Sequence, residues 1–173
     1  FTKSNSPLCS DYVRSLAFDS NRQLWIGTVD GLNIMDRYDV MTAYQSNTLD
    51  PGSLSQASVR CIYPDRQGGM WIGTYFGGLN YYHPVKNKFS NIRTIPGQNS
   101  LNNNVIGCIV EDSQHNLWIG TNGGINIYQA TRKRYEHVTT ENGLLSNDIK
   151  AIYTDPATGV AYIGSQLGGL GIM

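Results

Sequence analysis

The sequence predicts an all-β protein made of β-propeller blades of four antiparallel strands, with about three full blades and a partial fourth. The first observation behind this prediction is a repeat. Leu-Trp-Ile-Gly-Thr at 24–28 returns as Met-Trp-Ile-Gly-Thr at 70–74, as Leu-Trp-Ile-Gly-Thr at 117–121, and in altered form as Ala-Tyr-Ile-Gly-Ser at 161–165. The aromatic residues of these copies are 46, 47 and 44 residues apart, which is a typical blade length. The second observation is composition, because 19 Gly and 11 Tyr in 173 residues favour aromatic strands joined by tight turns.

The first strand of each repeat, which we call strand a, is a largely apolar stretch that ends at an aspartate. These strands are predicted at Val13–Phe18, Val59–Pro64, Ile106–Glu111 and Ile149–Thr154, and the aspartates are Asp19, Asp65, Asp112 and Asp155. An Asp side chain accepts hydrogen bonds from backbone N–H groups that follow it. We therefore expect each aspartate to cap a tight turn between strands a and b.

Strand b is the Trp-Ile-Gly-Thr segment, which is apolar on both faces and must be covered on both sides. We expect its Trp to fill the wedge between neighbouring blades. Gly27, Gly73 and Gly120 should let the facing sheet come close. A Gly-rich turn follows each strand b, because glycine supplies the positive φ that such hairpins need.

Strands c and d complete each blade. Strand c is predicted at Leu32–Met35, Leu79–Tyr82, Ile125–Tyr128 and Leu170–Met173, and strand d at Met41–Tyr44, Phe89–Ile92 and Tyr135–Val138. Asn33, Asn80 and Asn126 recur in strand c, and we expect them to bond to the backbone.

These strands divide the chain into blades of one propeller domain. Residues 1–10 form the end of a preceding blade or a linker, and the blades follow at 11–57, 58–104, 105–148 and, incomplete, 149–173. Seven blades of this length would need roughly 300 residues. We therefore expect a fragment of a larger propeller. Its exposed sheet faces would associate with a second copy or with the rest of a parent propeller.

Charge and hydropathy exclude several classes of partner. Thirteen basic and thirteen acidic residues cancel, so no nucleic-acid partner is predicted. No apolar run reaches the roughly 18 residues of a membrane helix, so direct membrane contact is not expected. Cys9, Cys61 and Cys108 are an odd number and make a poor disulfide framework.

No catalytic residue, metal site or cofactor is predicted. His83, His115 and His137 lie in a c–d turn, an a–b turn and a strand d, and their spacing matches no zinc motif. One aspartate per blade cannot supply the roughly six to eight oxygens that calcium takes. No nucleophile elbow or phosphate-binding loop is present. A propeller-type lyase or glycosidase, which would need clustered carboxylate, His or Tyr groups near the axis, stays open as an alternative.

Candidate ligand-binding residues gather at one end of the blades, where the b–c turns and the d–a linkers should meet. They are Asp30, Tyr75, Phe76, Asn103, Asn104, Asn122, Asn147, Asp148 and Gln166. Tyr75 and Phe76 vary against a constant Gly-Gly frame. Aromatic faces beside amides suit a sugar, since they offer ring contact and hydrogen bonds. The alternative is that Tyr75 or Phe76 packs against a neighbouring loop.

The repeat, best developed at residues 105–126, resembles the two-component regulator propeller repeat. The resemblance extends over three full copies and a fourth that departs at Tyr162, Ser165 and Gly171. It implies the periplasmic sensor region of a bacterial hybrid two-component system. Many such systems recognise oligosaccharides and regulate polysaccharide-utilisation genes through a histidine kinase, which here would lie outside the chain. A structural or dimerisation propeller without ligand is the alternative.

Overall fold

The structure is a computed structural model that describes residues 1–83, 85 and 88–173. All regular elements in these residues are strands. The chain forms two compact units, Phe1–Ile92 and Arg93–Met173, each holding two antiparallel sheets.

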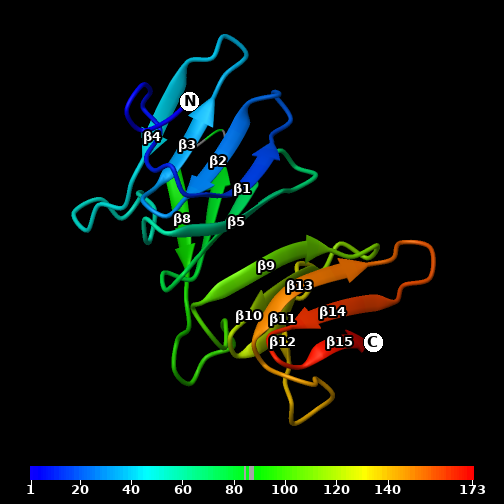
Figure 1. Cartoon of the computed structure of the whole chain (residues 1–173). Coiled ribbons are helices and arrows are strands. Elements are labelled where there is room, and N and C mark those ends of the chain that lie inside the picture. The colour runs from blue at the N-terminus through cyan, green and yellow to red at the C-terminus, as the bar shows by residue number, and fades with distance from the viewer. Residues whose placement is uncertain (84, 86–87) are drawn as a thin grey trace. The chain divides into compact units, whose positions relative to one another are not determined.

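The N-terminal unit contains two four-stranded sheets whose strands follow one another in sequence order (Figure 1). The first sheet consists of β1 (Val13–Phe18), β2 (Leu24–Thr28), β3 (Leu32–Met35) and β4 (Met41–Tyr44). The second consists of β5 (Val59–Pro64), β6 (Met70–Thr74), β7 (Leu79–His83) and β8 (Lys88–Ile92).

The C-terminal unit contains the third and fourth sheets. The third consists of β9 (Ile106–Glu111), β10 (Leu117–Thr121), β11 (Gly124–Gln129) and β12 (Arg134–Val138). The fourth has three strands, β13 (Ile149–Thr154), β14 (Ala161–Ser165) and β15 (Gly169–Ile172). The predicted fold class is thereby confirmed as four small antiparallel sheets arranged as propeller blades, the last with three strands.

The predicted strands are confirmed, with small shifts at their ends. Strand β11 is longer than predicted at both ends, and β15 begins and ends one residue earlier. The prediction that His83 lies in a turn is wrong, because β7 continues through this residue by pairing with Lys88. Residues 84, 86 and 87 of the predicted blade 58–104 lie outside the described residues. The blade boundaries within the linkers stay a prediction.

A tryptophan fills the space between the two sheets of the N-terminal unit, as predicted. Trp25 on β2 is fully buried in a cluster with Val59 on β5 and Ile72 on β6. Its ring meets the ring of Tyr82 edge-on, with 5.0 Å between the centroids. Burial of so large a side chain is a main source of cohesion between the sheets.

Glycine lets strand b approach the next sheet. A Cβ atom at Gly27 would lie 2.6 Å from Val59 Cγ1, and one at Gly120 would lie 2.7 Å from Ile149 Cγ2. Real Cβ atoms do not come this close, so the predicted close approach is confirmed at both positions. The same role for Gly73 stays a prediction.

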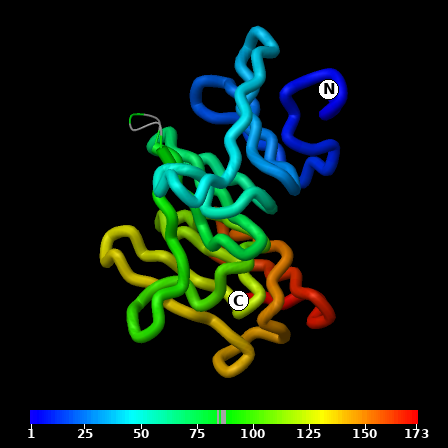
Figure 2. Tube along the Cα trace, turned by 90° about the vertical axis from the view of Figure 1, so that its left-hand side faces the viewer, coloured from blue at the N-terminus to red at the C-terminus, as the bar shows by residue number. Residues whose placement is uncertain are grey.

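The three strand-c asparagines fasten the chain segment that precedes strand a. Asn33 Oδ1 accepts a hydrogen bond from the Cys9 N–H at 2.9 Å, and its Nδ2 donates to the Pro7 carbonyl at 2.9 Å. Asn80 and Asn126 accept from the N–H groups of Ser55 and Asn102, each at 2.8 Å. The predicted backbone role is confirmed. In the first sheet Leu8 also packs with Ile26 and Met41. Figure 2 traces the N-terminal segment that leads into this sheet.

Candidate functional site

The b–c end of each blade is a hairpin closed by the threonine of the repeat. In each full copy the Thr hydroxyl donates to a glycine carbonyl at 2.8–2.9 Å across the turn, joining Thr28 to Gly31, Thr74 to Gly78 and Thr121 to Gly124. These glycines have φ of 150°, 76° and 111°. The expected positive φ is therefore confirmed, and the hairpin is a rigid support for whatever stands on its tip.

Each hairpin is also bonded to the linker that enters its own blade. The first residue of the turn donates its N–H to the carbonyl just before strand a, which joins Val29 to Tyr12, Tyr75 to Ser58, Asn122 to Val105 and Gln166 to Asp148 at 2.8–3.2 Å. The b–c turns and d–a linkers therefore share one end of each blade, as predicted.

An aromatic pair stands on the hairpin of the second sheet. The rings of Tyr75 and Phe76 lie 4.2 Å apart between centroids and are 39% and 60% exposed. The Phe76 N–H donates to Gln56 Oε1 at 2.9 Å, which fixes the turn to the linker. Both rings keep a surface open to solvent while their backbone is held at two points.

Two arginines beside this pair were not predicted as site residues. In every strand a, pairing with strand b skips the second residue, which is therefore the extra residue of a β-bulge: Arg14, Arg60, Gly107 and Lys150. Bulges re-aim a side chain relative to the regular strand alternation. The signal was present in the sequence, because aligning the four copies places a basic residue here in three of them.

Arg14 is joined to the aromatic hairpin through Ser58, and Arg60 lies over the Tyr75 ring itself. Arg14 Nη1 donates to Ser58 Oγ at 3.0 Å, and the Ser58 carbonyl accepts the Tyr75 N–H at 3.0 Å. The guanidinium carbon of Arg60 lies 5.1 Å from the centroid of the Tyr75 ring. Strands β1 and β5 pack beside each other in this unit. One side of the hairpin is thus cationic.

Some of the other candidate residues are exposed, whereas others form side-chain hydrogen bonds within the chain. Asp30, Asn122 and Gln166 are exposed on the turns of their own blades. Asn104 and Asn147 bond through both amide atoms to Thr94 and Thr140, respectively, and so close their linkers.

Two further candidates lie in the linkers of the C-terminal unit. Asn103 accepts the Val105 N–H at 2.8 Å. Asp148 pairs with Lys150 at 2.6 Å. The structure brings Tyr75 and Phe76 together and leaves the linker residues of this unit in bonds of their own.

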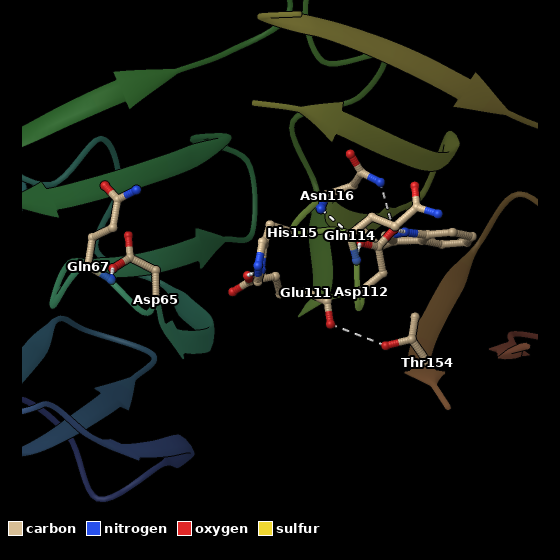
Figure 3. Close-up of polar contacts among 9 residues, drawn as sticks. Asp65, Gln67, Glu111, Asp112, Gln114, His115, Asn116 and Thr154 are labelled. Carbon is tan, nitrogen blue, oxygen red and sulfur yellow. Dashed lines mark hydrogen bonds and ion pairs between the residues drawn. The ribbon is translucent and has the colours of Figure 1, made fainter. Parts of the chain in front are cut away.

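The opposite end of the blades carries the aspartate caps. Asp112 Oδ1 accepts the N–H groups of Gln114 and Asn116, each at 2.8 Å, while Oδ2 accepts the indole N–H of Trp118 at 2.9 Å (Figure 3). Thr154 of the fourth sheet donates to the Glu111 carbonyl at 3.2 Å. The predicted turn capping is confirmed for Asp112.

Equivalent caps form in the other repeats. Asp19 and Asp65 each accept two turn N–H groups, and Asp155 accepts one from Ala157. The Asp19 carboxylate also accepts the Trp25 indole N–H at 3.1 Å. In the second repeat the second carboxylate oxygen accepts the Tyr81 hydroxyl at 2.8 Å instead.

Burial and the hydrogen bonds of these caps shift the pKa values of several side chains. Burial raises the pKa of Asp112, but the hydrogen bonds from Trp118, Asn116 and Gln114 outweigh it and lower the pKa from 3.8. Burial and the Asp65 carboxylate raise the pKa of Tyr81 to about 12. Burial raises the pKa of the Cys108 thiol to about 12. Asp112 and Tyr81 belong to the aspartate caps, at the end opposite the b–c turns.

Among the residues that the structure describes, no group of three or more His, Cys, Asp or Glu side chains could hold a metal ion. No helix in the described part of the chain is long and apolar enough to cross a membrane.

The histidines have separate surroundings. His115 Nδ1 lies 2.6 Å from Glu111 Oε1, and His137 Nε2 lies 2.9 Å from the Ser100 carbonyl oxygen.

The repeats match a known family. The family described as two component regulator propeller matches residues 7–30, 53–76 and 100–123. The chain carries two-component regulator propeller repeats. The matched segments run from the d–a linker through strand b into the b–c turn, so the second match ends with Tyr75 and Phe76.

One solved structure agrees with this assignment. The chain is similar to the extracellular domain of the hybrid two component system BT3049 from B. thetaiotaomicron, with 27% identity and a TM-score of 0.86. The match covers 94% of this chain but only 23% of that one. None of the curated proteins matches the sequence significantly.

Two other solved structures share the fold alone. The computationally designed Ika4 protein has 13% identity and a TM-score of 0.66, with 98% of this chain and 94% of that chain covered. Virginiamycin B lyase from Staphylococcus aureus has 11% identity and a TM-score of 0.65, with 94% and 55% covered.

Proposed function

We propose that this chain is part of a periplasmic sensor propeller that binds an oligosaccharide at the b–c end of its blades. The signal would pass to a histidine kinase outside the chain and regulate polysaccharide-utilisation genes. The likeness to the extracellular domain of BT3049 supports an extracytoplasmic sensor. The observation that carries ligand binding is the exposed aromatic pair of Tyr75 and Phe76 on a fixed hairpin.

The pair suits a sugar for physical reasons. An aromatic face contacts the apolar C–H face of a pyranose ring, while nearby polar groups bond its hydroxyls. The Tyr75 and Phe76 backbone is already bonded to Ser58 and Gln56. Little ordering is needed on binding, so less of the contact energy is lost.

Calorimetric titration against a panel of neutral and acidic oligosaccharides tests the proposal. Tyr75→Ala and Phe76→Ala should each weaken binding about tenfold, the usual size of a loss of about 1–2 kcal/mol. Tyr38→Ala is the matched control. Tyr38 is an exposed tyrosine under an arginine, 4.7 Å from Arg37 Cζ, but it lies on the c–d turn at the other end.

The site would be refuted by binding that is unchanged in both variants. Absence of binding to every saccharide would favour a docking role. That second candidate has an observation of its own. One face of the fourth sheet exposes Tyr153, Tyr162, Leu170 and Ile172, of which Tyr153, Tyr162 and Ile172 are cross-strand neighbours.

A further inference from the structure

We propose that the ligand of this face is an acidic saccharide, whose carboxylate or sulfate group binds between Arg14, Ser58 and Arg60 beside the aromatic pair. The inference rests on the proposed function and adds the charge of the ligand. It is carried by the bulge residues of β1 and β5, which the sugar contact alone does not require.

The geometry places two guanidinium groups on one framework. Ser58 accepts a hydrogen bond from Arg14 through its hydroxyl and from Tyr75 through its carbonyl, at 3.0 Å each. Arg60 lies over the Tyr75 ring at 5.1 Å. A guanidinium that stacks on a ring keeps its in-plane N–H donors available, and these match the two oxygens of a carboxylate or sulfate.

The charge of these arginines is not balanced nearby. Within residues 1–83, 85 and 88–173, neither guanidinium forms an ion pair with a carboxylate, whereas Lys150 at the equivalent bulge pairs with Asp148 at 2.6 Å. The chain as a whole has no net charge. Arg14 and Arg60, which lie at adjacent bulges without an ion-pair partner among the described residues, therefore create a local positive potential that attracts anions. The rest of the chain does not add to it as a basic surface would.

The aromatic pair makes a saccharide the occupant rather than a simple anion. Tyr75 belongs to both the aromatic pair and the cationic site, since the centroid of its ring lies 4.2 Å from that of Phe76 and 5.1 Å from Arg60 Cζ. A uronic acid or a sulfated sugar offers a ring face and an acidic group in one molecule. A neutral sugar would leave the two arginines without an anionic partner.

The test uses the 173-residue chain and three probes: trigalacturonate, the same trisaccharide with its carboxylates methyl-esterified, and a sulfated carrageenan tetrasaccharide. Arg14→Gln and Arg60→Gln should each weaken binding of the acidic probe about tenfold and change binding of the ester little. Added salt should weaken only the acidic probe. Binding of trigalacturonate identifies a carboxylate ligand, and binding of the tetrasaccharide a sulfate ligand.

Further variants separate charge from folding. Arg37→Gln removes an arginine that also lies over a tyrosine, at the opposite end of the first sheet, and should leave binding unchanged. Arg60→Lys keeps the cation without the planar fork and should recover part of the affinity. Thermal unfolding of all variants should match that of the wild type, because Arg14 is exposed and Arg60 half-buried.

The inference and the proposed function fail in different ways. Equal binding of acid and ester, or arginine variants that bind the acid normally, would overturn the anion site and leave a neutral-sugar sensor standing. Absence of binding to all three probes and to the neutral panel would overturn both.

Discussion

At the scale of the residue, one aspartate fixes two parts of a repeat at once. In the first and third repeats the carboxylate holds the a–b turn with one oxygen and the tryptophan indole with the other. The turn and the aromatic side chain that packs between sheets are therefore set by the same group. In the fourth repeat Asp155 accepts the Thr158 hydroxyl at 2.7 Å instead, and the aromatic residue is a tyrosine.

This double role predicts the behaviour of Asp112→Asn. Since the folded-state pKa of Asp112 lies below its ordinary 3.8, its contribution is present above that pH and is lost as the pH falls through the folded value. The variant should lose about 1–3 kcal/mol at neutral pH, the size of a hydrogen bond to a charged group. Urea unfolding measures this: between neutral pH and about pH 3, the free energy of unfolding should fall less for the variant than for the wild type.

Asp36→Asn is the control for this prediction. Asp36 caps the c–d turn of the first sheet through the N–H groups of Tyr38 and Val40, without a tryptophan partner. Asp36→Asn should therefore lower the free energy of unfolding at neutral pH by less than Asp112→Asn does. An Asp112→Asn protein whose stability follows the wild-type pH curve would contradict the assignment.

At the scale of the element, the repeat motif is explained by where strand b lies between two sheets. Gly27→Ala would place a methyl group 2.6 Å from Val59 Cγ1, so β2 and β5 must separate. Gly164 occupies the same place in β14, but its nearest neighbour would be 3.5 Å away. Gly27→Ala should therefore cost about 1–3 kcal/mol of unfolding free energy. Gly164→Ala should stay within about 0.5 kcal/mol.

Chemical unfolding of the two variants measures this difference directly. Both substitutions are Gly to Ala at equivalent positions of a strand, so the change in backbone entropy is matched. Equal effects would mean that the contact between β2 and β5 is not what requires the glycine.

The strands were predictable because the repeat fixes them four times over. Trp25, Gly27 and Thr28 each recur with the same neighbours, and each has one structural task in the folded sheet. The arginines escaped prediction for a different reason. Regular strand alternation does not mark Arg14 or Arg60, and a bulge changes where the second residue of strand a points.

The amide candidates show the opposite difficulty. Asn104 and Asn147 lie in d–a linkers at the predicted end of the blade, and this place made them ligand candidates. Their amides bond to Thr94 and Thr140, ten and seven residues earlier in the chain. A hydrogen-bond partner across a linker depends on how the linker folds, which residue type and spacing do not define.

At the scale of the whole molecule, the fourth and first sheets each expose a face of the kind that packs against a neighbouring sheet elsewhere in the chain. Within the units, a strand-b face with Trp and Gly meets the strand-a residues of the next sheet, as Gly27 meets Val59 and Gly120 meets Ile149. The fourth sheet presents the equivalent face around Tyr162, which is 38% exposed. The first sheet presents Val13 and Leu16, the equivalents of Val59 and Ile62, and both are exposed.

These two faces predict head-to-tail association of the chain. The β14 face of one copy would receive the β1 face of another. Tyr162 and Ile172 would then be covered as Trp25 and Ile34 are in the first sheet, and Leu16 would be partly covered, like Ile62. Such a contact joins different surfaces, so it forms rings or longer assemblies rather than a self-paired dimer. Sedimentation velocity should show a mass that rises with concentration. Ile172→Arg should shift that rise to at least about tenfold higher concentration, because it buries an unpaired charge.

Leu49→Arg tests whether the effect is specific to the sheet face. Leu49 is as apolar and more exposed, but it belongs to the linker after β4 and to neither sheet face. This variant should associate like the wild type, since its charge stays in water. A chain that sediments as a monomer at every concentration would contradict head-to-tail association. A monomer in which Tyr162 and Leu16 are both protected from solvent would instead place the same contact within one copy.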